Sequence, residues 1–256
     1  MSLADHLREL RRRLVIAGIA IALASVIGWL RYDWLLTQLT APLDVVRHQR
    51  HGSLVGINFG GVTSAFSIKL KVALFVGVII ASPVWLYELW AFIVPGLTRR
   101  ERRTAAAFIA AAVPLFLGGC YLALWALPKA VEVLLGFTPS GAVNLTNASD
   151  YLSFVTRFIL AFGLAFLLPV LLVALNAANV LPARVMLKGW RPAVMLIFVF
   201  AAMMTPTPDA WTMIALAMPM VGLYFAAVGI AALLDRRRAR RQPDWLQVSD
   251  DEASSL

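Results

Sequence analysis

Long apolar runs with few charged residues are the feature that most constrains how this chain can fold. Such runs occupy residues 14–30, 64–94, 105–127, 151–181, 192–205 and 210–234. A helix of about 20 apolar residues spans the roughly 30 Å hydrocarbon core of a bilayer. Because 61% of the 256 residues are hydrophobic and only 14% are charged, unlike a soluble domain, the sequence predicts an all-α integral membrane protein with six transmembrane helices.

The predicted spans differ in length. Spans 64–94 and 151–181 are long for one crossing, so these helices should tilt, protrude or kink, and Pro83 is the expected kink site. Span 192–205 is confined between Pro192 and Pro206. A helix over residues 193–205 rises only about 20 Å, so this span must begin earlier or cross a thinned bilayer.

The segments outside the spans have distinct characters. Residues 2–13 carry leucines at helical spacing and charges on the other faces, which indicates an amphipathic helix at the membrane surface. Residues 31–63, with a short interfacial helix near Trp34, and residues 128–150 are expected to form outer loops. The tail, residues 235–256, is basic and then acidic, which indicates a disordered segment.

The distribution of Lys and Arg predicts the orientation. Sixteen of the 23 basic residues fall at the N-terminus, in segments 95–104 and 182–191, and in the tail, whereas the opposite loops hold four. Lys and Arg accumulate on the cytoplasmic side of membrane proteins. Residues 1–234 are therefore predicted to form a single six-span domain with both termini in the cytoplasm.

Several other functions are disfavoured. A net charge of +9 can indicate nucleic-acid binding, but the basic residues cluster at the ends of the apolar runs, where topology signals lie. His6, His48 and His51 lack metal-ligand spacing. Because no phosphate-binding loop or nucleophile motif is present, neither an enzyme nor a cofactor is expected.

Two glutamates lie among arginines on the predicted cytoplasmic face. Glu9 and Glu101 are each flanked by four arginines. One interpretation is local, because Glu9 can pair with Arg13 at i,i+4, and an exposed pair of this kind contributes a few tenths of a kcal/mol. The other is that the two carboxylates receive a cationic ligand while the arginines keep them ionised. The spacing leaves both interpretations open.

Other ionisable residues near the span ends have simpler explanations. Asp209 precedes the last span, where it can cap the helix N-terminus. Glu88 and Arg157 lie close enough to the ends of their spans to snorkel toward water.

An octapeptide near the N-terminus, His6 to Arg13, resembles the HLxELRxR signature of the TatC family, the large membrane subunit of the twin-arginine protein translocase. Matching motifs follow in the same order and spacing at Ala41–Leu43, Ser82-Pro83, Trp90–Leu97, Glu101–Arg103, Asp150–Phe154, Ala161–Gly163, Pro169, Arg191-Pro192 and Thr205–Asp209. The resemblance covers roughly residues 3–234.

The resemblance implies six helices in a cupped, glove-like arrangement, with short fifth and sixth helices, in the bacterial plasma (inner) membrane. It implies a receptor that binds twin-arginine signal peptides on the cytoplasmic face and, with TatA and TatB, exports folded proteins using the proton-motive force. Self-association in a larger complex is also implied, and no cofactor is. The family's recognition carboxylates fall on Glu9 and Glu101. Supporting positions fall on Arg11, Phe92, Arg102 and Arg103, and outer-loop positions fall on Pro42 and Asp209.

Two positions depart from the family pattern. Leu167 stands where many relatives have a glutamate, and Met213 stands where many have a glutamine. These changes weaken the expectation of a polar contact to a TatA-like or TatB-like helix and argue against a proton relay there. A small-molecule transporter would need a polar site near mid-membrane, and an intramembrane enzyme would need paired catalytic groups. The sequence favours neither.

Overall fold

The structure, a computed structural model, describes residues 3–49, 55–61, 63–93, 99–136, 144–204 and 210–239. Its elements are α1 (Leu3–Leu30), α2 (Tyr32–Gln49), β1 (Val55–Asn58), α3 (Ser64–Ile80), α4 (Ser82–Ile93), α5 (Arg99–Gly136), β2 (Asn144–Asn147), α6 (Ala148–Ala177), α7 (Ala183–Lys188), α8 (Trp190–Met204) and α9 (Ala210–Ala239). The predicted all-α class is confirmed, with one small parallel pair of strands that the sequence did not indicate.

Several of these helices are suited to a bilayer. Four segments are long and apolar enough to cross one: Asp5–Leu30, Ala106–Gly136, Ala148–Ala177 and Met213–Ala239. The bent pair α3 and α4 gives a fifth. Helix α8 is apolar but has only 15 residues, so it rises about 22 Å. The expectation that this segment is short is confirmed.

Helix α1 differs from the prediction, because the amphipathic segment and the first span form one continuous helix. No Pro or Gly interrupts residues 3–17, so nothing in this stretch ends the helix. Helix α1 packs closely on α3. A Cβ atom at Gly28 would lie 2.9 Å from the Cα of Ala73, so only glycine permits this approach.

Helices α3 and α4 form one bent unit. The bend is 61° and breaks the helix at Ala81. Pro83 has no N–H for the carbonyl of Ile79, which explains the break. The indole N–H of Trp85 donates to the backbone oxygen of Val78 across the bend, at 2.9 Å. The predicted kink is confirmed, and it brings α4 against α1.

Helices α5 and α6 pack along each other. A Cβ atom at Gly119 would lie 2.6 Å from the backbone oxygen of Phe162, and one at Gly163 would lie 2.7 Å from the sulfur of Cys120. The two glycines therefore set the closest approach of the two helices. Helix α5 continues through Pro128 to Gly136, so much of the loop predicted at residues 128–150 is helical.

The predicted loop at residues 31–63 is also largely helical. Helix α2 occupies 18 residues of it, and Pro42 is buried within that helix. The phenol of Tyr151 donates to the backbone oxygen of Leu39 at 3.0 Å, which fastens α2 to α6. Strands β1 and β2 pair in parallel, with Val55 opposite Asn144.

The end of α9 corrects the predicted tail boundary, because the helix continues to Ala239. A carboxylate oxygen of Asp235 accepts from the backbone N–H of Ala183 at 2.8 Å, and the other accepts from the amide of Asn176 at 3.0 Å. The guanidinium of Arg238 donates to the backbone oxygens of Asn176 and Ala177. This end of α9 therefore holds the connection between α6 and α7. Residues 240–256 lie outside the described residues.

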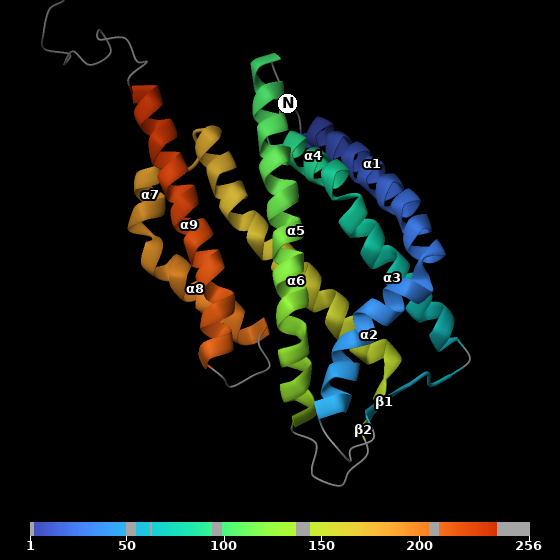
Figure 1. Ribbon diagram of the computed structural model, residues 1–256. Helices are drawn as coiled ribbons and strands as arrows, with labels where there is room; N and C mark the ends of the chain where they lie inside the picture. The colour runs from blue at the N-terminus through green and yellow to red at the C-terminus, as the bar shows by residue number, and fades with distance from the viewer. Residues whose placement is uncertain are drawn as a thin grey trace, which may run out of the picture.

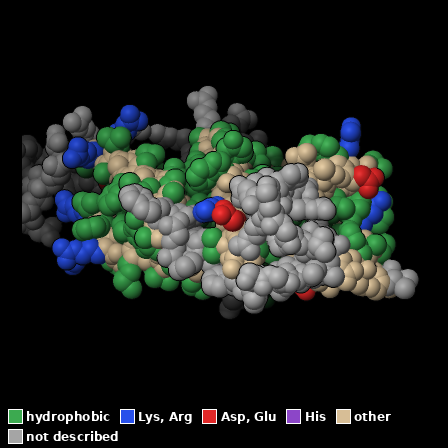
Figure 2. Space-filling view, turned by 60° about the horizontal axis from the view of Figure 1, so that its bottom comes forward, with side chains coloured by type: hydrophobic (Ala, Val, Ile, Leu, Met, Phe, Trp, Pro, Cys, Tyr) green, Lys and Arg blue, Asp and Glu red, His purple; other side chains and the backbone are tan. Residues whose placement is uncertain are grey.

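The helices form an elongated body (Figure 1). Helix α5 runs along its centre, with α1, α3 and α4 on one side and α7, α8 and α9 on the other. The N-terminus, the start of α5 and the end of α9 lie at one end of the body, and α2, β1 and β2 lie at the other (Figure 1). Hydrophobic side chains cover much of the described part of the face that Figure 2 shows, as expected against lipid.

Candidate functional site

Glu9 lies in the first turns of α1, where its carboxylate is partly exposed. Its Oε1 atom is 2.6 Å from the guanidinium of Arg13, one helical turn later. The local i,i+4 pair expected from the sequence is therefore present. This pair does not use all the hydrogen-bond acceptor sites of the Glu9 carboxylate. The Glu9 side chain remains 39% exposed, and a carboxylate that binds one guanidinium can still accept further hydrogen bonds.

Arg13 makes a second ion pair, which the sequence did not reveal. Its Nη1 atom donates to Oε2 of Glu88 in α4 at 3.0 Å. The Arg13 and Glu88 side chains are only 19% and 12% exposed. Glu88 was expected to snorkel alone toward water; instead it is held by a partner 75 residues earlier in the chain.

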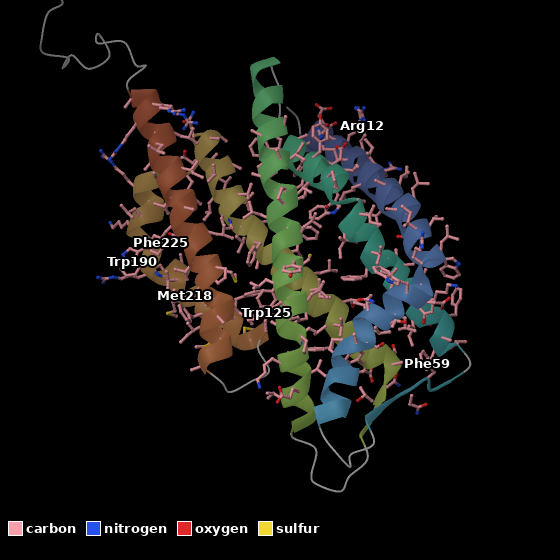
Figure 3. All side chains as sticks on the ribbon, in the orientation of Figure 1. Arg12, Phe59, Trp125, Trp190, Met218 and Phe225 are labelled. Carbon is pink, nitrogen blue, oxygen red and sulfur yellow. The ribbon has the colours of Figure 1, made fainter. Side chains whose placement is uncertain are left out.

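Aromatic rings extend this cluster. The imidazole of His6 stacks on the ring of Phe92, with centroids 4.6 Å apart. Arg11 is exposed on the neighbouring surface of α1, and Arg12 lies on the same part of α1, near the N-terminal end of the body (Figure 3). The structure thus brings Glu9, Arg11 and Phe92 to one end of two packed helices.

The other predicted site residues are placed less fully. Glu101, Arg102 and Arg103 belong to the first turns of α5, which begins at the same end of the body as α1 (Figure 1). The side chains of these three residues lie outside the described part of the structure, and so does the whole of Asp209. Pro42 lies at the opposite end, buried in α2.

The cluster of Glu9, Arg13 and Glu88 has a simple charge balance. Two carboxylates share one guanidinium, so the cluster carries a net charge of −1 when all three groups are ionised. A second guanidinium would neutralise it and could bind in the bidentate geometry that carboxylates favour. The residues that the structure describes contain no group of three potential metal ligands. The partly exposed carboxylate of Glu9 can therefore accept hydrogen bonds from a further cationic group.

Sequence reasoning missed Glu88 and His6 as members of this cluster. His6 stands within the octapeptide that resembles the family signature, so its position was marked although its partner was not. Glu88 had one available signal, namely an acid near the end of an apolar span that needs a counter-charge.

Comparisons with known proteins agree with this picture of a multi-pass helical membrane protein. Residues 5–219 match the family model for the Sec-independent protein translocase protein TatC. The TatC protein of Xylanimonas cellulosilytica is 50% identical over 241 residues, which cover 94% of this chain and 87% of the relative. That of Frankia casuarinae is 40% identical over 266 residues, covering 100% of this chain and 73% of the relative.

A solved structure gives the same result for the fold. The crystal structure of the twin-arginine translocase receptor TatC in DDM aligns with a TM-score of 0.70 and 31% sequence identity, over 88% of this chain and 99% of that one. This chain belongs to the TatC family. It is therefore a multi-pass membrane subunit of the twin-arginine protein translocase, a transport component that acts within a complex rather than a catalytic enzyme.

Proposed function

We propose that this protein is the receptor and core subunit of the translocase and binds twin-arginine signal peptides on the cytoplasmic face. The observation that carries the proposal is the ion-pair cluster in which Glu9 and Glu88 share the single guanidinium of Arg13. The exposed side of the Glu9 carboxylate keeps acceptor capacity for one arginine of a signal peptide, and that side is where the arginine approaches.

The second recognition carboxylate in this proposal is Glu101. The start of α5 and the start of α1 lie at one end of the body, so Glu9 and Glu101 can each receive one of two consecutive arginines. Phe92 provides an apolar surface on α4, beside His6 of α1. Arg11, Arg102 and Arg103 are the supporting cytoplasmic positions in this proposal.

The proposed topology has six spans and places both termini in the cytoplasm of a bacterium, with the protein in the plasma membrane. It is supported by the bias of Lys and Arg toward the end of the body that carries the N-terminus. The sixth crossing is α8, which spans only if the bilayer thins locally. Residues 1–234 then form one cupped membrane domain.

The remaining steps of export are proposed to involve partners. TatA and TatB join this subunit, which self-associates in the larger complex, and the proton-motive force drives export of folded proteins. Pro42 and Asp209 act at the outer end, where Pro42 is part of the packing of α2. Leu167 packs against the apolar core, so no proton relay is proposed through that position.

Neutralising the recognition carboxylates tests the receptor role. The variants Glu9→Gln and Glu101→Gln are expected to weaken binding of a fluorescent twin-arginine signal peptide to the purified protein by about ten- to a hundredfold each, since a hydrogen bond to a charged group contributes about 1.5–3 kcal/mol. Fluorescence anisotropy measures the affinity.

A matched control is Glu132→Gln. Glu132 is also 39% exposed and pairs with Lys129 at 3.0 Å, but it lies near the opposite end of α5. This variant should bind the peptide as the wild type does. Wild-type binding by a Glu9→Gln, Glu101→Gln double variant, or an equal loss in Glu132→Gln, would contradict the proposed receptor site.

A further inference from the structure

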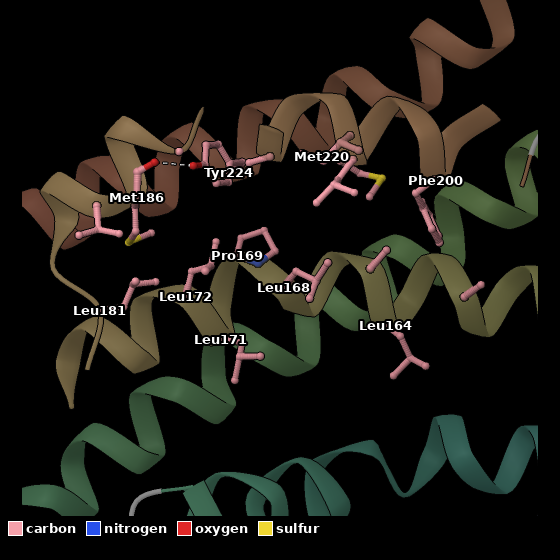
Figure 4. A pocket seen from close by; sticks show the side chains of 17 residues that line it. Leu164, Leu168, Pro169, Leu171, Leu172, Leu181, Met186, Phe200, Met220 and Tyr224 are labelled. Atoms are coloured by element: carbon pink, nitrogen blue, oxygen red, sulfur yellow. Dashed lines mark hydrogen bonds between the residues drawn. The ribbon is translucent and has the colours of Figure 1, made fainter. Parts of the chain in front are cut away.

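An apolar cavity of about 730 Å³ lies between α6, α7, α8 and α9. Figure 4 shows Leu168, Pro169 and Leu172 of α6 on one side of it and Met186, Tyr224 and Met220 on the other. Helix α9 packs against both α6 and α8. The cavity is therefore a groove with α9 at its base and with α6 and α8 as its walls.

The chemistry of the lining selects a hydrocarbon occupant. Its lining side chains are apolar apart from the phenol of Tyr224, and that hydroxyl donates to the backbone oxygen of Met186 at 2.7 Å. A polar solute would lose its hydration there without gaining hydrogen bonds, which is costly. A flexible alkyl chain has no polar groups whose hydration would be lost in the cavity.

Cationic side chains stand on the segments that border one end of this groove. Val185, Met186 and Gly189 line the cavity, and Arg184 and Lys188 alternate with them, exposed and one helical turn apart. Arg191 follows, with its guanidinium 5.6 Å from the centroid of the Trp190 ring. Figure 2 shows Lys and Arg side chains along the edge of the molecule that α7, α8 and α9 form.

These three cations have no carboxylate partner among the residues that the structure describes. The nearby carboxylate of Asp235 is already engaged by the N–H of Ala183 and the amide of Asn176. An anion at the α7 segment would therefore meet positive charge that the described residues do not neutralise.

We propose that this groove is a binding site for an anionic phospholipid. One acyl chain occupies the cavity, and the headgroup phosphate binds Arg184, Lys188 and Arg191. Basic pockets between membrane helices bind anionic headgroups in this way. A peptide helix would fill the apolar groove but would leave the three cations without a counter-charge, so the charge favours the lipid.

Native mass spectrometry of the full-length protein, stripped of lipid in detergent, tests the site. Dioleoyl phosphatidylglycerol should bind at one site at least tenfold more tightly than dioleoyl phosphatidylcholine, which has the same chains and no net charge. Each Lys or Arg beside an anionic headgroup contributes about a fivefold gain in affinity. The triple variant Arg184→Gln, Lys188→Gln, Arg191→Gln should therefore lose roughly a hundredfold.

Two further variants separate this site from general attraction of charge. Arg12→Gln, Arg31→Gln, Lys129→Gln removes three exposed cations that lie outside α6, α7, α8 and α9 and should bind phosphatidylglycerol as the wild type does. Ala193→Phe places a ring in the cavity and should weaken binding although the cations remain. If that variant does not fold, the two triple variants decide the question.

Several outcomes would overturn the proposal. The first is equal affinity for the two phospholipids, and the second is an equal loss of affinity in the two triple variants. The third is displacement of the lipid by equimolar glycerol phosphate, because that result would indicate a site for a free anion. A dimer that forms in place of lipid binding and disappears in Ala193→Phe would assign the groove to a second copy of the chain. None of these outcomes bears on signal-peptide binding, so the two proposals fail independently.

Discussion

Arg13 is held differently by its two partners. Glu88 is 12% exposed and Glu9 is 39% exposed. An ion pair that is shielded from water interacts through a lower dielectric than an exposed one, and a buried charge that loses its partner is left uncompensated. The structural contribution of Arg13 should therefore come mainly from Glu88, which leaves Glu9 free for a ligand.

A double-mutant cycle measures this difference. The coupling energy between Arg13→Gln and Glu88→Gln should be about 1–3 kcal/mol, and that between Arg13→Gln and Glu9→Gln should be a few tenths of a kcal/mol. Denaturant unfolding in detergent gives both values. Equal coupling energies would mean that Glu9 is as much a structural residue as Glu88.

At this scale the sequence predicted local pairs and missed distant ones. The Glu9–Arg13 pair follows from a spacing of four residues on a helix. The Arg13–Glu88 pair depends on the 61° bend between α3 and α4, which brings α4 against α1. Which residues such a bend brings together depends on tertiary packing, so the sequence did not reveal this pair. Asp235 was likewise assigned to a disordered tail, because its partners Asn176 and Ala183 lie on other elements.

At the scale of elements, glycines decide how closely the helices approach. Gly163 faces Cys120 and Phe116 of α5 at distances that leave no room for a Cβ atom, whereas Gly222 in α9 has open space around its Cβ position. Both residues lie inside long helices. Replacing glycine by alanine at each position therefore separates the effect of helix packing on stability from the effect of helix propensity.

Gly163→Ala should destabilise the protein by about 1–3 kcal/mol, because the added methyl group forces α5 and α6 apart. Gly222→Ala should be neutral or stabilising, since alanine favours a helix over glycine by about 1 kcal/mol. Thermal unfolding in detergent compares the two variants with the wild type. An equal or smaller loss at Gly163 would show that the α5–α6 contact is not tightly packed.

The sequence predicted the elements well where apolar runs were long, and less well at their ends. Spans 105–127 and 210–234 correspond to α5 and α9, but both helices extend beyond the apolar residues. Apolar composition marks the part of a helix that lies in lipid, whereas hydrogen bonding and caps determine where the helix ends. For this reason the surface helix and first span predicted separately form a single helix, α1.

At the scale of the whole molecule, the distribution of charge supports the proposed orientation. The N-terminus and the end of α9 lie at one end of the body, and basic residues are concentrated in the segments at that end. An even number of crossings returns the chain to the side on which it began. The proposed topology requires α8 to be one of these crossings despite its 15 residues.

Cysteine labelling in protoplasts tests this topology, starting from a Cys120→Ala variant without other cysteines. A membrane-impermeant maleimide should label Asn58→Cys and Gly136→Cys from outside. It should reach Asp5→Cys and Ala239→Cys only after the membrane is opened. Labelling of Ala239→Cys in intact protoplasts would exclude the proposed position of the C-terminus.

The receptor site is tested most directly by photocrosslinking from position 92. A benzoylphenylalanine at Phe92, beside His6 and on the helix that carries Glu88, should crosslink to a twin-arginine signal peptide at least tenfold more than to its twin-lysine counterpart, because only guanidinium forms the bidentate pair with carboxylate. The same crosslinker at Phe59, an exposed aromatic residue at the opposite end, should label neither peptide. Equal labelling of both peptides from position 92, or labelling from position 59, would contradict the account.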